Sequence, residues 1–267
     1  MARRQLDAEL VRRGLATSRT EAQAAVRDGL VLVGGRTAGK ASTLVDPAEP
    51  VELVGPARHF VSRGGEKLDA ALEGFGIEVA GRRALDAGAS TGGFTDCLLQ
   101  RGAGHVITVD VGYGQLAWSL RGDPRVTVLE RTNVRDLRPE ALPFAPEILV
   151  ADLSFISLRL AIGALASVAA EEAELVLLVK PQFEAGRDAV GPGGVVRDPE
   201  RWADAIRGVS EAAEDARLRP LGVMACPVRG PAGNVEFLLH ATKAARPGAV
   251  LDVDAALAAG LEIAGRA

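Results

Sequence analysis

The chain has 267 residues, of which 48% are apolar and 25% are charged, and these proportions are those of a folded globular protein rather than a disordered one. The formal net charge of −4 excludes a chain that is basic throughout, although it leaves room for a basic module. Two cysteines cannot supply a disulfide framework or a zinc site, so we expect buried thiols and no bound metal. The N-terminus is charged where a signal peptide needs an apolar run, and no apolar stretch reaches the roughly 20 residues that span a bilayer. We therefore expect a cytoplasmic protein without a membrane partner.

The first 60 residues predict a small α+β module with an excess of positive charge. They hold nine lysines and arginines against seven acidic residues. Apolar residues recur at helical spacing over residues 6–15, and the capping box Ser18–Glu21 begins a second helix that ends near Gly29. Residues 30–33 and 51–54 read as short strands, and a Gly-Gly turn of the hairpin type follows the first of them.

The arginines of this module lie on and between the two predicted helices, where their guanidinium groups can meet the backbone of an RNA. On charge alone, a solvated helix face is the simpler explanation. The candidates for RNA contact are Arg3, Arg4, Arg12, Arg13 and Arg19.

Residues 58–63 read as a linker, and from residue 64 onward the pattern is that of an α/β domain. A helix is expected at 64–75, and strand and helix signals then alternate, which is typical of a doubly wound, Rossmann-like sheet. Such sheets bind ligands beyond the carboxyl ends of their strands, at the topological switch point. The expected strands are 83–86, 106–110, 126–129, 148–152, 175–180, 218–223 and 235–239, and the expected helices are 93–100, 115–120, 158–169, 199–216 and one after Leu251.

The stretch from Asp86 to Phe94, a strand end followed by a Gly-rich turn and a helix, is the most informative part of the sequence. Ser90 stands where a dinucleotide-binding loop needs a glycine, and no Gly-Lys-Ser/Thr follows, so the dinucleotide fingerprint and the P-loop are both absent. Asp86 is expected to face the loop cavity, where it would repel a pyrophosphate and attract a cation. Asp110 ends the next strand, where a carboxylate commonly binds ribose hydroxyls. S-adenosylmethionine, with a positive amino-acid end, a ribose and no phosphate, fits both carboxylates. The alternative is an ordinary strand–turn–helix with incidental glycines.

Four polar residues stand near the ends of apolar elements. Asp152 and Lys180 end two of the expected strands, Glu236 begins the last strand, and Lys67 lies in the helix at 64–75. Each of them alone fits a solvated charge or a structural ion pair. Together, two lysines and two acids around a methyl donor can activate a sugar hydroxyl. A free lysine has a pKa near 10.4 and is a poor base at neutral pH, so we expect burial and a neighbouring cation to lower the pKa of such a lysine.

Motifs spread along the whole chain match one known family. They are Ser18-Arg19 and the segments 29–36, 62–68, 86–95, 110–115, 130–133, 151–157, 179–184, 190–196 and 233–236. In these motifs the chain closely resembles the TlyA-type ribosomal RNA 2′-O-methyltransferases, a family historically called hemolysin A. The resemblance implies an RNA-binding domain of the ribosomal-protein-S-four type at residues 1–57. It also implies an FtsJ-like methyltransferase domain at residues 64–267, with seven strands of which the last is antiparallel.

The resemblance implies a catalytic tetrad of Lys67, Asp152, Lys180 and Glu236. In this assignment Lys180 takes the proton from the target 2′-hydroxyl or polarises it, while Asp152 orients the Lys180 ammonium and steers the methyl donor. Lys67 and Glu236 position the ribose and balance charge. The methyl group passes in line from sulfonium to oxygen, and no metal is required.

The resemblance also implies that the first glycine loop binds S-adenosylmethionine, with Asp110 on its ribose and Asn133 on its adenine side. The candidates in the loop are Asp86, Gly88, Ser90, Thr91, Gly92, Gly93 and Phe94. The linker residues Arg58, His59, Phe60 and Val61 correspond to a short motif that is proposed, in this family, to couple RNA binding to cofactor affinity. Phe60 stands where the family usually has tryptophan.

The 2′-hydroxyl makes the substrate RNA rather than DNA. The resemblance implies cytidines of ribosomal RNA within ribosomal subunits, and the long, Arg-rich N-terminus resembles the versions that modify both subunits. Three alternatives remain. A membrane-lytic protein lacks support in a chain without a signal peptide or an inserting segment. A non-catalytic assembly factor could keep the same fold. A nicotinamide-dependent dehydrogenase conflicts with the broken dinucleotide fingerprint.

Overall fold

The computed structural model describes residues 3–16, 19–27, 29–54, 59–186, 190–245 and 247–265. The chain divides into two compact units, Met1–Arg58 and His59–Ala267. Ser18 of the predicted capping box and Arg58 of the predicted linker lie outside the described residues.

The first unit is built around a small apolar core that two helices share with short strands. Leu6, Leu10 and Val26 of the helices pack with Val31 and Val45 of the strands, and all five side chains are buried. The sheets of this unit have the orders β1-β4 and β3-β2-β5. Its elements are β1 (Arg4–Gln5), α1 (Leu6–Arg12), α2 (Arg19–Arg27), β2 (Val31–Val33), β3 (Arg36–Thr37), β4 (Leu44–Val45) and β5 (Val51–Leu53).

Both predicted helices and both predicted strands of the first unit are present. Gly34 and Gly35 connect β2 to β3 with φ angles of 56° and 76°, which is the backbone that a tight hairpin turn requires. β1, β3 and β4 were not predicted, because a strand of two residues is too short for alternation to show in the sequence.

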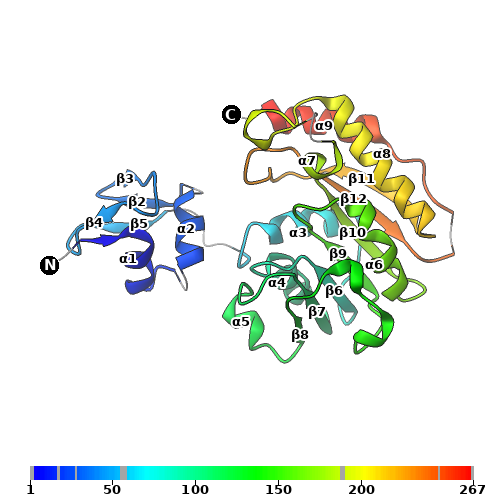
Figure 1. Ribbon diagram of the computed structural model, residues 1–267, viewed down its shortest axis with the longest axis horizontal. Helices are drawn as coiled ribbons and strands as arrows, with labels where there is room; N and C mark the ends of the chain where they lie inside the picture. The colour runs from blue at the N-terminus through cyan, green and yellow to red at the C-terminus, as the bar shows by residue number, and fades with distance from the viewer. Residues whose placement is uncertain are drawn as a thin grey trace. The chain divides into compact units, whose positions relative to one another are not determined.

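The second unit contains a seven-stranded sheet in the order β11-β12-β10-β9-β6-β7-β8 (Figure 1). Neighbouring strands run parallel except at β12, which is antiparallel to β10 and to β11. The predicted doubly wound sheet with an antiparallel last strand is therefore confirmed. Its strands are β6 (Arg83–Ala87), β7 (His105–Val109), β8 (Val126–Leu129), β9 (Ile148–Ala151), β10 (Glu174–Val179), β11 (Arg219–Ala225) and β12 (Phe237–Thr242).

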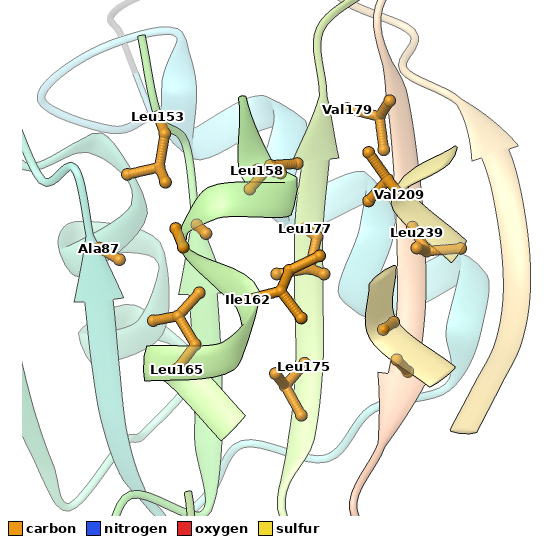
Figure 2. Packing of buried hydrophobic residues seen from close by; sticks show 14 of the residues in the cluster. Ala87, Leu153, Leu158, Ile162, Leu165, Leu175, Leu177, Val179, Val209 and Leu239 are labelled. Carbon is orange, nitrogen blue, oxygen red and sulfur yellow. The ribbon is translucent and has the colours of Figure 1, made fainter. Parts of the chain in front are cut away.

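Alternate residues of the central strands enter two different cores, because side chains of a strand point to opposite faces in turn. Leu85 and Leu149 pack on the side of α6 and α8, whereas Ala84 and Ile148 pack on the side of α3 and α4. Figure 2 shows Ile162 of α6 among the leucines of β10 on the first of these sides. Each fully buried leucine contributes about 2 kcal/mol. The helices are α3 (Gly64–Phe75), α4 (Gly93–Gln100), α5 (Trp118–Arg121), α6 (Ile162–Val168), α7 (Pro181–Glu184), α8 (Pro199–Asp215) and α9 (Val253–Gly265), with short 3-10 turns η1 (Val134–Asp136), η2 (Pro139–Ala141), η3 (Leu158–Leu160) and η5 (Pro192–Gly194).

Both cysteines are buried, as predicted. Cys97 lies in α4 and Cys226 follows β11, and neither side chain is exposed. Burial raises the pKa of each thiol to about 12. Both therefore remain protonated thiols at neutral pH, and a protonated thiol is not a nucleophile.

Candidate active site

A cavity of about 770 Å³ lies at the carboxyl ends of β6, β7 and β9. In the sheet, β6 has β7 on one side and β9 on the other, so this is the point at which the strand order reverses. The volume falls within the roughly 300–1,000 Å³ of small-ligand sites. The lining residues are Gly88, Ser90, Val109, Asp110, Val111, Gly112, Gln115, Thr132, Asn133, Val134, Arg135, Asp152, Leu153, Ser154, Phe155, Ile156, Ser157 and Leu160.

The turn after β6 needs glycine at two points. Gly88 has a φ angle of 83°, and a Cβ there would lie 2.6 Å from the carbonyl oxygen of Asp152. Gly92 has a φ angle of 96°, and a Cβ there would lie 2.3 Å from a side-chain carbon of α5. Gly88 thus lets the backbone of the loop pass directly against the segment that follows β9, and Gly92 lets it pass directly against the side chains at α5.

Asp110 follows β7 and is fixed by two backbone N–H groups. Ser90 donates to Oδ2 and Gly112 donates to Oδ1, both at 2.7 Å. Each carboxylate oxygen keeps a further lone pair, and the side chain lines the cavity. Asp110 is therefore a rigid acceptor on the cavity wall.

Asp86 does not face the cavity, which corrects the expectation from the sequence. Its side chain is fully buried, and Thr95 Oγ1 donates to Oδ2 at 2.6 Å. Oδ1 has no hydrogen-bond partner among the residues that the structure describes. Burial, together with the charges of Asp152 and Asp110, raises the pKa of Asp86 to about 7. The physical reason for its position is that β6 runs one residue further than predicted, to Ala87, so Asp86 lies within the sheet rather than at its rim.

The predicted cofactor residues divide into two groups. Those on the cavity wall are Gly88, Ser90, Asp110 and Asn133. Those behind the glycine loop, none of which lines the cavity, are Asp86, Thr91, Gly92, Gly93 and Phe94. Phe94 belongs to the core that α3 and α4 share, and it is only 3% exposed. The loop thus presents its first half to the cavity and uses its second half to start α4.

Lys180 and Asp152 stand side by side because each follows directly after one of two neighbouring strands, β10 and β9. Lys180 Nζ lies 2.5 Å from Asp152 Oδ1 and donates to Ser154 Oγ at 3.0 Å. The lysine is buried, but Asp152 keeps 24% of its side chain exposed and lines the cavity together with Ser154. Lys180 itself does not line the cavity, but its ammonium is held by two residues that do.

Lys67 of α3 and Glu236, which directly precedes β12, form a second pair that is sealed from solvent. Nζ lies 2.5 Å from Oε2, and the two side chains are 5% and 0% exposed. Burial acts to lower the pKa of Lys67, but the charges of Glu236 and Asp152 outweigh it and raise that pKa above its usual value. The sequence-based expectation of a lowered pKa applies to a lysine that acts as the base, and Lys67 does not have the surroundings for it, because its nearest charged neighbours are carboxylates rather than a cation. Lys67 keeps its proton at neutral pH.

Two further residues belong to the site although they were not predicted as site residues. Ser154 accepts the Lys180 hydrogen bond, and its signal in the sequence is its position two residues after Asp152, just beyond the end of a strand. Phe155 has a φ angle of 65° and a side chain that is 93% exposed, with its ring centroid 5.4 Å from that of Phe183. Nothing in the sequence alone indicates such a backbone at a phenylalanine.

Three residues of the predicted linker, His59, Phe60 and Val61, belong to the second unit and contact its helices α3 and α4. Phe60 is 5% exposed, and the space over its ring exists because residue 65 is glycine. The Val61 N–H donates to Asp96 Oδ2 at 2.7 Å, and Gln100 Nε2 donates to the His59 carbonyl at 2.9 Å. Since Asp96 and Gln100 lie in α4, this segment is fixed to the helix that the glycine loop begins.

Three of the predicted RNA-binding arginines are paired with buried carboxylates. Arg12 and Arg13 both donate to Glu9, whose pKa these guanidinium groups hold at about 2. Arg19 binds Asp7 at 3.0 Å. Arg13 also donates to the carbonyls of Glu49 at 2.9 Å and Pro47 at 3.0 Å. Arg13 thus ties α1 to the turn before β5.

Two other predicted arginines, Arg3 and Arg4, are exposed and form no ion pair within the described part of the chain. Among residues 3–265, leaving aside the undescribed gaps, no group of three or more histidine, cysteine or acidic side chains is arranged to hold a metal ion. Among the described helices, none has the length and apolar character needed to cross a membrane.

Comparison with known proteins assigns both units to families. Residues 60–243 match the family of FtsJ-like methyltransferases, and residues 4–51 match the S4 domain. The chain is 55% identical, over 241 residues and 90% of both chains, to the 16S/23S rRNA (cytidine-2′-O)-methyltransferase TlyA of Mycobacterium tuberculosis. It is 45% identical over 237 residues to the putative rRNA methyltransferase YqxC of Bacillus subtilis, covering 88% of this chain and 84% of that one. A solved structure, a putative hemolysin from Streptococcus thermophilus, is 37% identical with a TM-score of 0.79, covering 98% of this chain and 97% of that one.

Proposed function

The chain belongs to the TlyA family of FtsJ-like ribosomal RNA methyltransferases, and from that premise we propose that it transfers a methyl group from S-adenosylmethionine to the ribose 2′-hydroxyl of cytidine in the ribosomal RNA of both subunits, in the cytoplasm. The observation that carries this proposal is the contact of Lys180 with Asp152 and Ser154, two residues that line the switch-point cavity. The sealed Lys67–Glu236 pair supports it, because the Asp152 charge acts on Lys67 as well. The two lysines and the two acidic residues of these pairs are thus close enough to interact through their charges.

The cavity fits S-adenosylmethionine by its volume and by the groups on its wall. Asp110 would accept hydrogen bonds from the ribose hydroxyls, and Asn133 would lie on the adenine side. The backbone at Gly88 would bound the methionine part of the site. Asp86, with its orphaned Oδ1 behind the loop, would act on a positive ligand through its charge rather than by contact. When bound, S-adenosylmethionine supplies an electrophilic methyl group on a sulfonium centre.

Lys180 is the group that would receive the hydroxyl proton. As an ammonium its nitrogen carries three N–H groups besides Cε. Once the ammonium has released one proton to solvent, the two remaining N–H groups face Asp152 and Ser154, and a lone pair takes the third direction. The third direction remains for the 2′-hydroxyl. A neutral Lys180 then accepts the proton as the ribose oxygen gains its methyl group, so that the O–H bond breaks while the O–C bond forms.

Lys67 has a different role, because its raised pKa keeps it charged. A permanent ammonium cannot act as a base, but it stabilises negative charge that develops on the reacting ribose. Glu236 fixes this ammonium, and a Cβ at residue 230 would lie 2.5 Å from Glu236 Oε1, so a glycine there makes room for the carboxylate.

Residues 1–57 would bind the RNA, residues 64–267 would carry out the reaction, and residues 58–63 would join them. Arg3 and Arg4, with the exposed parts of Arg12 and Arg19, supply positive charge for phosphates. Arg13 has 19% of its side chain exposed and serves the fold more than the RNA. The attachment of residues 59–61 to α4 supports a role of the linker in coupling RNA binding to cofactor affinity, since α4 begins at the glycine loop.

The test is transfer of a labelled methyl group from S-adenosylmethionine to unmodified small and large ribosomal subunits. We expect label on cytidine 2′-oxygens in both subunits with the natural chain and none with Lys180→Ala. Lys243→Ala is the matched control, because that lysine is also hydrogen-bonded, to Ala166 and Ala169, but lies away from the cavity. Label in the large subunit alone would limit the substrate range. Absence of label despite cofactor binding would favour a ribosome assembly factor that keeps the fold.

A further inference from the structure

Two segments that leave the sheet side by side touch at three successive places. We call them the exit segments: residues 152–158 after β9 and residues 180–184 after β10. The three contacts are Lys180 with Asp152 and Ser154, Phe183 with Phe155, and Glu184 with Ser157 and Leu158. The proposed chemistry uses only the first contact.

Glu184 forms the last contact with both of its carboxylate oxygens. Ser157 Oγ donates to Oε2 at 2.5 Å, and the Leu158 N–H donates to Oε1 at 2.7 Å. Arg159 lies 3.5 Å away on the outer side. The Glu184 side chain is 2% exposed, so these bonds are shielded from water. A buried carboxylate that receives two donors from one short segment holds that segment in a single geometry.

The segment that Glu184 holds contains a strained backbone. Phe155 has a φ angle of 65° and is 93% exposed, so neither a glycine nor burial of its own side chain supports this conformation. On either side of it, Leu153 and Leu158 are 7% and 2% exposed, and Figure 2 shows both among the buried residues. Burial fixes the two leucines, whereas the polar groups of Ser157 and Leu158 depend on Glu184.

We propose that Glu184 is a positioning residue for methyl transfer: by holding Ser157 and Leu158, it keeps residues 152–158 in the geometry in which Asp152 and Ser154 orient the Lys180 ammonium. This inference rests on the proposed function, in which Lys180 meets the 2′-hydroxyl. α7 is short, with Glu184 only four residues after Lys180. The same carboxylate therefore fixes both exit segments relative to each other.

The first measurement compares the turnover of Glu184→Ala, Glu184→Gln and Ser154→Ala, and of the double variant Glu184→Ala/Ser154→Ala, on unmodified subunits. A displacement of about 1 Å at a reacting group can cost about 100-fold in rate, so we expect Glu184→Ala to lower kcat roughly 10- to 100-fold. The KM for RNA should stay within about twofold of the natural value, because the lost interaction would act in the transition state and not in RNA binding. Glu184→Gln, whose amide can still accept from Leu158 and donate to Ser157, should restore kcat to within about threefold.

The double variant separates positioning from a general structural role. If Glu184 acts through Ser154 and Asp152, Ser154→Ala should lower kcat in the natural chain but add little to Glu184→Ala. Additive effects, or a loss of activity that only follows the folded fraction, would overturn the proposal. If Glu184→Ala does not fold, Ser157→Ala removes one of the two bonds and is put through the same cycle.

Glu147→Ala is the matched control. Glu147 also accepts a backbone N–H, from Arg83 at 2.9 Å, and also pairs with an arginine, but it precedes β9 and so lies at the other end of that strand. It should lower thermal stability without changing kcat.

A crystal structure of Glu184→Ala gives a readout that does not depend on activity. We expect the Lys180–Asp152 contact to lengthen beyond hydrogen-bonding distance. An unchanged Lys180–Asp152 contact in the variant would refute the positioning role even if the natural chain methylates RNA. If the contact lengthens in the variant but the natural chain transfers no methyl group, the proposed function alone is refuted.

Discussion

Both units of the chain pair cations with carboxylates, but the pairs of the first unit and those of the candidate active site use different cations. In the first unit, Arg12 and Arg13 share Glu9, whose side chain is not exposed. In the second unit, Lys67 and Lys180 take the place of the arginines, with Glu236 and Asp152 as their partners. The distances are similar, so geometry alone does not separate the two arrangements.

The difference lies in what each cation can do next. A guanidinium does not lose its proton in proteins and binds a carboxylate through two parallel N–H groups, which suits a permanent structural tie. An amine can release and accept a proton when its surroundings allow it. The two pairs of the second unit also differ in exposure, because Glu236 is fully buried whereas Asp152 lines the cavity. The arginines, whose charge is permanent, therefore stabilise the fold of the first unit, whereas the lysine beside the cavity is a group that can exchange a proton.

The largest expected effect comes from exchanging one cation for the other at the cavity. Lys180→Arg keeps the charge but loses the removable proton, and we expect kcat for methyl transfer to fall by about 10²- to 10⁴-fold, the usual contribution of a general base. Lys180→Met removes the charge but keeps a side chain of similar length, and it should lower kcat by the same factor. Lys243→Arg is the control for the exchange itself. A kcat of Lys180→Arg above a tenth of the natural value would show that a positive charge alone suffices for methyl transfer.

Breaking the sealed pair should cost stability as well as activity. Glu236→Ala leaves the Lys67 ammonium buried without its partner, and we expect the free energy of unfolding to fall by about 3–5 kcal/mol. The double variant Lys67→Met/Glu236→Leu should regain most of that loss but no activity, since apolar replacements of a buried pair are often neutral. Urea denaturation and the methyl-transfer assay measure the two effects. Equal stability of the single and double variants would contradict this account.

Asp86→Asn should make the second unit more stable at alkaline pH. The folded-state pKa of Asp86 is about 7, against about 3.9 for an unfolded aspartate, so the folded state binds more protons between pH 4 and 7. The natural chain should therefore lose stability as pH rises through that window, by at most about 4 kcal/mol. Asparagine can still accept from Thr95, and the variant should lack this pH dependence and exceed the natural chain by about 1–3 kcal/mol at pH 8.

Denaturation curves at pH 5 and pH 8, with and without S-adenosylmethionine, check the role of Asp86. If its charge serves the cofactor, the stabilised variant should bind S-adenosylmethionine more weakly. A variant that keeps the pH dependence of the natural chain would place the titrating group elsewhere.

The smallest effects belong to the arginines of the first unit. Removing two phosphate contacts with Arg3→Ala/Arg4→Ala should reduce the salt dependence of subunit binding by a slope of about 1–2 and weaken affinity several-fold. Arg13→Ala should instead lower the melting temperature of the first unit without changing that slope, because Arg13 donates to Glu9 and to three backbone carbonyls. Binding measured over a series of salt concentrations distinguishes the two, and equal slopes for both variants would reject the distinction.

Much of the second unit could be predicted because its central strands are largely apolar and several strands are followed directly by a charged residue. Asp152 and Lys180 were predicted at strand ends, and both follow directly after their strands. Asp86 was misplaced because one additional residue of β6 turns a rim position into a buried one. The start of β12 was also predicted too early, since Asn234 binds Gly194 and Val196 before pairing begins.

Contacts between segments could not be predicted in the same way. Ser154, Ser157 and Glu184 occur in motifs that the sequence makes visible, yet their roles depend on the exit segments lying side by side. Likewise, Arg13 reads as one more basic residue until the turn before β5 supplies its acceptors. Periodicity and strand ends are local signals, whereas hydrogen bonds across more than 20 residues are not.

The burial of both cysteines makes the natural chain a ready background for thiol labelling. With thiol pKa values of about 12 and no exposed sulfur, Cys97 and Cys226 should not react with a maleimide at neutral pH. Exposed Ala48 in the first unit and exposed Glu172 in the second can therefore be exchanged for cysteine without first removing the natural ones. A donor and an acceptor dye at these positions would report the separation of the two units by resonance energy transfer as ribosomal RNA is added.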